Sequence, residues 1–206
     1  MKFFDNLPFN WFDIVLVVWL VMGVFRGRKR GMSAEVMTFL QWVAIVIVCG
    51  VAYEPAGKWF SETSGFGLLV YYVLAYLVIA GLVALVFIFI KRSIGGKLIG
   101  SDAFGKAEYY LGMPTGMLRF ACIMIFFLAL LNARFYSQKE IEAYDKFQKD
   151  VYGSDYFPGL QVLQSSVFEK SLVGPQIKKN LEFLLIKPTP PKGGKEFKQK
   201  EWQAPT

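Results

Sequence analysis

The 206-residue sequence contains no histidine, and this absence removes several kinds of active site. Zinc sites with histidine ligands, Ser-His-Asp triads and Cys-His dyads all need an imidazole ring. The two cysteines, Cys49 and Cys122, both fall inside apolar stretches, where small hydrophobic side chains are expected rather than a disulfide. The glycines near Gly95 lack the Walker spacing, and no cleft with paired carboxylates is indicated. We therefore expect no enzyme activity, no cofactor and no metal site.

The sequence is also poor in charge. Only 19% of its residues are charged and 54% are hydrophobic, whereas a soluble domain averages about 25% charged residues. The apolar residues are gathered into four blocks with charges between them. A soluble helical bundle is the alternative, but uninterrupted apolar blocks of this kind are typical of membrane spans. The sequence predicts an all-α membrane protein.

The four blocks cover residues 11–25, 36–53, 66–90 and 111–131. A transmembrane helix needs ~20 apolar residues, and the first block has only the stretch 14–25 free of charge. Its proximity to the N-terminus leaves a cleaved signal peptide as the rival interpretation. No small-x-small cleavage site follows it, and a basic run does. We predict about four transmembrane helices within a membrane domain of residues 1–131.

The net charge of +7 is concentrated in short loops. A nucleic-acid-binding arm is disfavoured, because the densest basic run lies between two apolar blocks. The positive-inside rule instead places the two basic loops in the cytoplasm, and the loop after the second block and both termini outside. The topology-setting residues are Arg26, Arg28, Lys29, Arg30, Lys91 and Arg92.

The rest of the chain divides into two parts. Residues 132–186 hold three amphipathic stretches, at 137–150, 160–172 and 175–186, which predict short extramembrane helices. For the third stretch we favour a position on the bilayer interface over packing against the other helices. Residues 187–206 are rich in proline, glycine and lysine, a composition typical of a disordered tail.

Ionisable groups inside a bilayer are costly, so each predicts either a structural pair or a functional site. Arg119 lies eight residues into the fourth block, about 12 Å from its cytoplasmic end at ~1.5 Å per residue. Asp13 and Glu35 are both candidate partners for it. A buried ion pair that orients helices and a conduction or relay role both remain open.

Two series of glycines have the i, i+4 spacing that lets helix backbones approach closely. The first runs Gly23, Gly27, Gly31 through the end of the first block, and the second is Gly112, Gly116. The same spacing also occurs by chance, so it is a weak signal alone.

Three of these patterns occur in order and together resemble the colicin V production protein family of bacterial inner-membrane proteins. They are an aspartate that begins the first block, an Arg-Gly-xxx-Glu turn followed by a helix reaching Trp42, and a Leu-Gly-xxx-Gly-xx-Arg start to the fourth block. The resemblance covers about residues 10–186. The positions that it carries over are Asp13, Arg30, Gly31, Glu35, Gly112, Gly116 and Arg119.

The resemblance implies a multi-pass inner-membrane accessory protein that supports bacteriocin production or secretion and envelope homeostasis, with no established catalytic activity. The alternative is a subunit of a small oligomeric channel or transporter, lined by Asp13, Glu35 and Arg119. The partners expected are the lipid bilayer and either a second copy of the chain or a secretion or envelope protein, with no nucleic acid.

Overall fold

We describe the chain from a computed structural model, which covers residues 10–63, 67–99, 105–136, 142, 146 and 159–189. The described part is almost entirely helical, as predicted, and its one extended contact is a single parallel bridge between Arg134 and Thr189. The elements in chain order are α1 (Trp11–Arg30), α2 (Met32–Thr63), α3 (Leu68–Ile99), η1 (Gly105–Ala107), α4 (Glu108–Asn132), α6 (Leu160–Phe168), α7 (Gly174–Asn180) and η2 (Glu182–Leu184).

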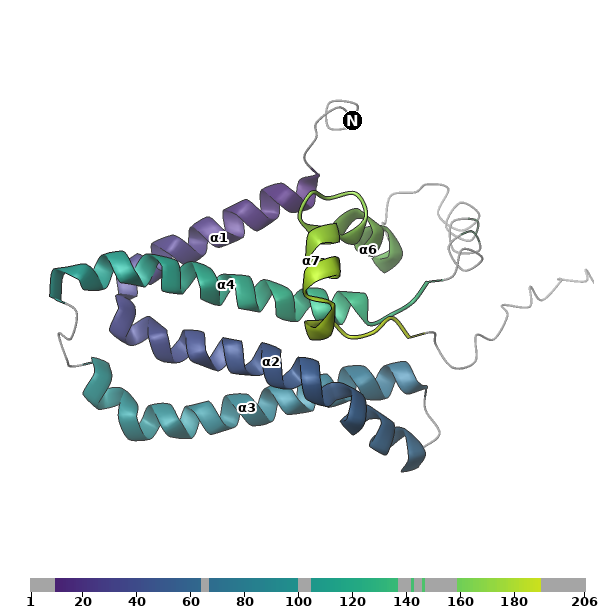
Figure 1. Cartoon of the computed structure of the whole chain (residues 1–206), viewed down its shortest axis with the longest axis horizontal. Helices are drawn as coiled ribbons and strands as arrows, with labels where there is room; N and C mark the ends of the chain where they lie inside the picture. Colours follow the sequence, from purple (N-terminus) through teal and green to yellow (C-terminus); the bar gives the residue numbers. More distant parts are fainter. Residues whose placement is uncertain are drawn as a thin grey trace, which may run out of the picture.

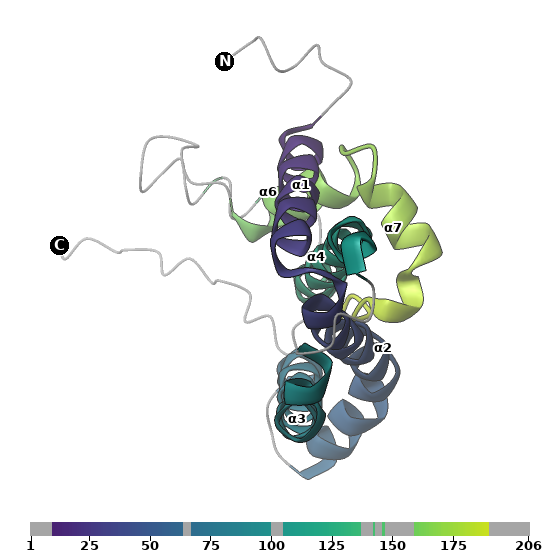
Figure 2. The same cartoon turned by 90° about the vertical axis from the view of Figure 1, so that its left-hand side faces the viewer.

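The four long helices form a row rather than a square bundle. Seen from the end, they are stacked in the order α1, α4, α2, α3 (Figure 2). α4 packs on both α1 and α2, and α3 packs mainly on α2. α1 slants across α4, so its beginning lies near α6 and α7 while its end lies at the far end of α4 (Figure 1). The second and fourth helices along the chain are therefore the central ones.

The first two helices are separated by a single residue, because Gly31 has a positive φ of 75°. That conformation is easily adopted by glycine, which has no Cβ. α1 begins with a capping box, in which the Asn10 side chain accepts from the backbone and Asp13 accepts from the Asn10 N–H. Its last turn carries Arg28, Lys29 and Arg30, whose positive charges are favourable at a helix C-terminus.

α2 and α3 extend well beyond the apolar blocks that predicted them. Each contains 32 residues. We expected residues 54–65 to form a loop, yet α2 continues through Pro55 to Thr63. Proline removes one backbone donor and bends a helix without always ending it. The connection between α2 and α3 is correspondingly short.

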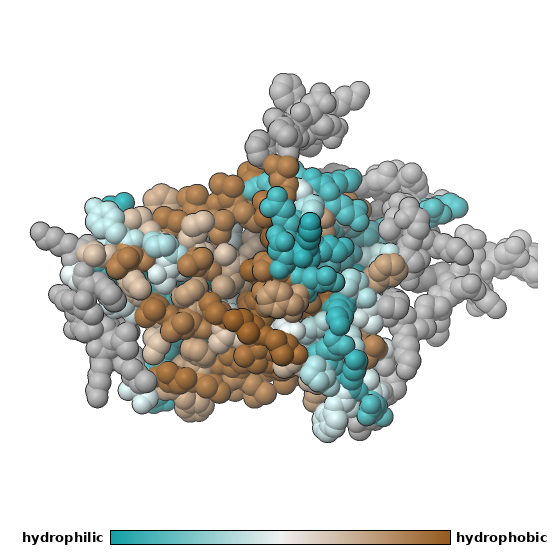
Figure 3. All heavy atoms as spheres, viewed as in Figure 1, coloured by the Kyte–Doolittle hydropathy of each residue, from teal (hydrophilic) through white to brown (hydrophobic). Residues whose placement is uncertain are grey.

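Among the residues that the structure describes, three helices are long and apolar enough to cross a membrane, and they correspond to Met32–Glu62, Leu68–Ser93 and Glu108–Asn132. α1, the remaining long helix, is not among these three; Asp13 and the basic end leave it a short apolar stretch. Apolar residues cover the middle of the molecule, and hydrophilic residues gather towards both ends (Figure 3). The chain is a multi-pass membrane protein with three clear spans, and the predicted count of four is approximate.

Two runs of basic residues, 26–30 and 91–92, lie at the same end of the long helices. One ends α1, and the other, Lys91–Arg92, was expected in a loop but lies within α3, which continues to Ile99 (Figure 1). The end of α2, the start of α3 and the segment 159–189 lie at the opposite end. This arrangement agrees with the loop pairing that the positive-inside rule predicts.

The C-terminal segment packs on the helices instead of spreading away from them. Leu185 and Ile186 are buried, with exposed fractions of 1% and 0%. The Asn132 side chain donates to the Ile186 carbonyl at 3.0 Å, and the Tyr53 hydroxyl accepts from the Lys187 N–H at 3.1 Å. A hydrogen bond from Lys187 to the Glu54 carboxylate, 2.8 Å long, raises the pKa of Lys187.

The three predicted amphipathic stretches have different outcomes. α6 corresponds to the second stretch. The third breaks into α7 and η2, and its apolar end enters the core, which differs from the interfacial position that we favoured. The first stretch, 137–150, lies outside the described residues except for Glu142 and Lys146, which are helical. Lys187, Pro188 and Thr189 continue the packed segment, and the rest of the expected tail lies outside the described residues.

Candidate functional site: charged residues at a glycine helix crossing

The centre of the site is an ion pair between Glu35 of α2 and Arg119 of α4. The Arg119 Nη1 donates to the Glu35 Oε2 at 2.5 Å. Glu35 is 0% exposed and Arg119 is 4% exposed, so neither charge faces lipid. Glu35 lies in the first turn of α2, where the helix dipole favours a negative charge. The pair joins the two central helices, α2 and α4, close to the basic end of α1.

Further cations surround this pair. Arg30 Nη1 lies 3.9 Å from Glu35 Oε1, too far for a hydrogen bond. Lys91 of α3 donates to Gln41 at 2.6 Å and to Thr38 at 3.4 Å, both on α2. One carboxylate therefore faces Arg119 directly, with Arg30 close by. The guanidinium of Arg119 also lies over the Phe120 ring, 5.0 Å from its centroid, a favourable cation–π contact.

The two glycine series pack directly on each other. A Cβ on Gly27 would lie 2.0 Å from the Gly112 carbonyl oxygen, and one on Gly116 would lie 2.3 Å from the Gly23 oxygen. Real Cβ atoms do not approach backbone so closely, so α1 and α4 cross at a distance that only glycine permits. The Trp19 indole donates to the Phe120 carbonyl at 3.0 Å on the same crossing. This crossing brings Arg30 at the end of α1 close to the ion pair.

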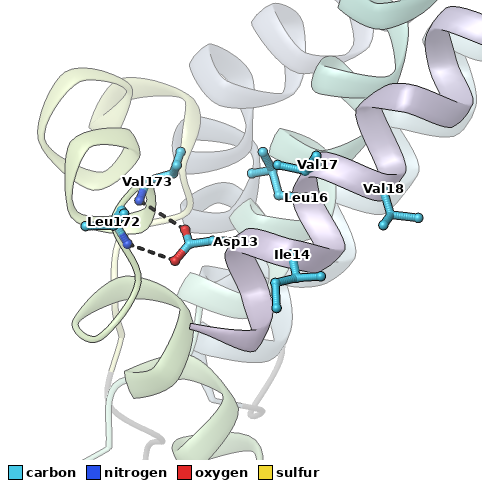
Figure 4. A pocket seen from close by; sticks show the side chains of 7 residues that line it. All are labelled: Asp13, Ile14, Leu16, Val17, Val18, Leu172 and Val173. Carbon is cyan, nitrogen blue, oxygen red and sulfur yellow. Dashed lines mark hydrogen bonds between the residues drawn. The ribbon is translucent and has the colours of Figure 1, made fainter. Parts of the chain in front are cut away.

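Asp13 lies elsewhere and is not the partner of Arg119. Its carboxylate accepts backbone N–H groups from Asn10 at 3.0 Å, Leu172 at 3.2 Å and Val173 at 3.4 Å. Asp13 is 6% exposed, and the last two bonds are drawn in Figure 4. Asp13 therefore fastens the start of α1 to the loop between α6 and α7. Of the two partners considered for Arg119, the structure brings only Glu35 to it.

An open apolar pocket of about 310 Å³ lies beside Asp13 (Figure 4). It is lined by one side of α1 and by the 172–173 loop. The Asp13 oxygens already accept three backbone N–H groups, and the other side chains that line the pocket are apolar.

Several contacts were missed by sequence reasoning. The Asn10 side chain donates to the Ser166 carbonyl at 2.6 Å, and the Asn-x-x-Asp spacing of the capping box was the available signal for its role. Lys91 was identified only as a topology-setting residue, although it also joins α3 to α2. No local pattern marks Asn132, whose partner is 54 residues away.

The contacts of the site hold helices together. In the part of the chain that the structure describes, no group of three or more His, Cys, Asp or Glu is placed to bind a metal ion. Cys49 is buried among the core aromatics, where its thiol lies 3.5 Å from the Tyr76 carbonyl. The residues that the sequence singled out join α1, α2, α3 and α4 to one another.

A comparison with protein-family models matches residues 12–168 to the family described as colicin V production protein. The chain belongs to this family. The match covers more than half of the chain, which confirms the resemblance drawn from the three sequence patterns. No curated protein matches the chain, and no solved structure matches it.

The colicin V production protein match includes the charged residues and the glycines of the site, but not Asn10, Leu172 and Val173, which donate to Asp13. Asp13, Glu35 and Arg119 lie inside it, as do the glycines of the α1–α4 crossing. It ends at Phe168, before α7 and the packed segment that follows. The ion pair and the crossing therefore belong to the family region, whereas the contacts of Lys187 and Ile186 lie beyond it.

Proposed function

We propose that this chain is a non-enzymatic accessory protein of the bacterial inner membrane that supports colicin V-type toxin production or secretion and envelope homeostasis. The observation that carries the proposal is the enclosed Glu35–Arg119 pair, set at a helix crossing inside a chain of the colicin V production protein family. A buried ion pair is better suited to fixing one helix arrangement than to increasing stability. A fixed arrangement is what a scaffold for other membrane components requires.

The surface is consistent with such a role. Large apolar side chains are exposed along α1 and α3, as expected for helices in contact with lipid or with other membrane helices. The segment 159–189 lies towards one end of the long helices (Figure 1). On the positive-inside orientation that end faces away from the cytoplasm. The protein then presents its basic turns to the cytoplasm and a folded extension to the other side.

The channel alternative is less well supported. It assigned pore-lining roles to Asp13, Glu35 and Arg119. Each of the three side chains is at most 6% exposed and has a bonding partner within the same chain. A pore between subunits lined by these groups would require the α1–α4 crossing to open, which the close glycine contacts oppose.

The proposal is tested by complementation in a colicin V-producing bacterium that lacks its own member of the family. The wild-type chain should restore colicin activity in the medium, measured against the activity retained in the cells. Arg119→Leu should restore much less at equal membrane abundance, because Glu35 is left without its partner. Lys179→Gln, a charge removal on the exposed last turn of α7, is the matched control and should behave as wild type.

Two outcomes would contradict the proposal. One is that deleting the chain from its own bacterium changes neither toxin release nor the resistance of the cells to detergents. The other is a voltage- or tension-dependent current from the purified, reconstituted chain that Arg119→Leu alters, which would favour the channel.

A further inference from the structure

The basic end of the molecule carries far more positive charge than its own carboxylates neutralise. Within the described residues, the acidic groups at this end are Glu35 and Glu108. The Glu108 carboxylate accepts from the Ser33 N–H at 3.3 Å, at the start of α2. The basic groups at or near this end are Arg26, Arg28, Lys29, Arg30, Lys91, Arg92 and Arg119.

Part of this charge is concentrated around the ion pair rather than spread over the surface. Arg119 is repelled by Arg30 and Arg26, and Lys91 is repelled by Arg119 and Arg30. Glu35 is the carboxylate that attracts both Arg119 and Lys91. Four cations thus act on one another across α1, α3 and α4, with the buried Glu35 carboxylate among them. We call these four residues the cation cluster: Arg26, Arg30, Lys91 and Arg119.

Some donors in the cluster remain available. Arg119 Nε is buried and has no hydrogen-bond partner in the described chain, because the pair with Glu35 uses Nη1. Arg30 lies beyond hydrogen-bond distance of Glu35, and 44% of its side chain is exposed. Lys91 is half-buried where the apolar stretch of α3 ends. Its bonds to Thr38 and Gln41 bring it no negative charge.

We propose that Arg30 and Lys91, beside the Glu35–Arg119 pair, bind the headgroup of an anionic phospholipid. The position selects this ligand, because Arg30 and Lys91 lie where the apolar stretches of α1 and α3 end, the depth at which lipid phosphates lie. A phosphate oxygen accepts hydrogen bonds from guanidinium and ammonium groups and balances the excess charge. The acyl chains would lie along the apolar faces of α1 and α3, whose exposed residues include Val21, Phe25 and Phe89.

The test uses the full chain, purified in a neutral detergent. Phosphatidylglycerol or phosphatidylcholine is added, and bound lipid is counted by native mass spectrometry while thermal unfolding is followed. Wild type should retain phosphatidylglycerol preferentially and unfold at a higher temperature with it. Each nearby basic residue contributes to attraction of anionic lipid, so Arg30→Gln with Lys91→Gln should weaken retention by roughly tenfold or more.

The matched control removes two charges from the same end but outside the cluster, by Arg28→Gln with Arg92→Gln. If both double variants lose phosphatidylglycerol equally, the attraction is general surface electrostatics and the proposal is wrong. It is also wrong if wild type shows no preference between the lipids, or if inorganic phosphate alone reproduces the thermal shift. Should the first double variant fail to fold by circular dichroism, Arg30→Gln alone, compared with Arg28→Gln, decides the same question.

Discussion

At the scale of single residues, the buried charges of Asp13, Glu35 and Arg119 are held in two ways. Asp13 is bound by backbone N–H groups and connects the start of α1 to the 172–173 loop. Glu35 and Arg119 are bound to each other. Transfer of an unpaired charge out of water is costly, and a paired charge recovers much of that cost. Removing one member should therefore be more harmful than removing both.

This difference is measurable with a double-mutant cycle on Glu35 and Arg119. We expect Arg119→Leu to lower the free energy of unfolding by about 3–5 kcal/mol, because an uncompensated carboxylate stays buried. Glu35→Leu combined with Arg119→Leu should cost less than the sum of the single changes, with a coupling of about 1 kcal/mol or more. Unfolding in detergent micelles, followed by circular dichroism, provides the values.

The control for that cycle pairs Arg119→Leu with Asp13→Asn. These two should be additive, because Asp13 has its hydrogen bonds at the α6–α7 loop. Additivity for Glu35 and Arg119 as well would show that the ion pair does not join α2 to α4 in the folded protein.

At the scale of elements, the packing of α1 on α4 depends on small residues. The glycine series of the two helices meet backbone to backbone, and the Trp19 indole bonds to α4 on the same side. Lipid provides no hydrophobic driving force between helices, so close van der Waals contact and hydrogen bonds have to hold them together. The crossing is therefore sensitive to a single added methyl group.

Gly27→Ala should destabilise the protein by about 1–3 kcal/mol, because its Cβ would collide with the Gly112 backbone, which has no flexible side chain to move aside. Gly81→Ala is the matched control on α3, where a Cβ would meet no atom within 4 Å. That change should be neutral or stabilising by up to about 1 kcal/mol, since alanine is the better helix former. Equal thermal midpoints for the two variants would refute the close crossing.

Much of the helical structure and of its packing was predictable from the sequence, and some was not. The apolar blocks indicated the long helices, and the glycine spacing indicated close packing, because both are local patterns. The partner of Arg119 and the docking of Ile186 against Asn132 depend on residues far apart in the chain. The length of α2 was missed because Pro55 marks a helix end in most sequences, whereas here the helix continues.

At the scale of the whole molecule, the four long helices run between two polar ends (Figure 3). The basic runs and the cation cluster lie at one end of the long helices, and the end of α2, the start of α3, α6 and α7 lie at the other (Figure 1). α1 spans this distance in the structure although its charge-free stretch is only residues 14–25. Basic side chains at its end are able to extend towards the membrane surface, which makes a short span workable.

The most direct test of this account is the labelling of single cysteines with a membrane-impermeant maleimide in whole cells and in inverted vesicles. The native Cys49 is buried and Cys122 is half-buried within α4. We predict that Lys29→Cys and Arg92→Cys are labelled only from the cytoplasmic side, and that Trp11→Cys, Glu62→Cys and Lys179→Cys are labelled only from the opposite side. Labelling of Trp11→Cys from the same side as Lys29→Cys, or of Lys29→Cys and Arg92→Cys from opposite sides, would contradict it.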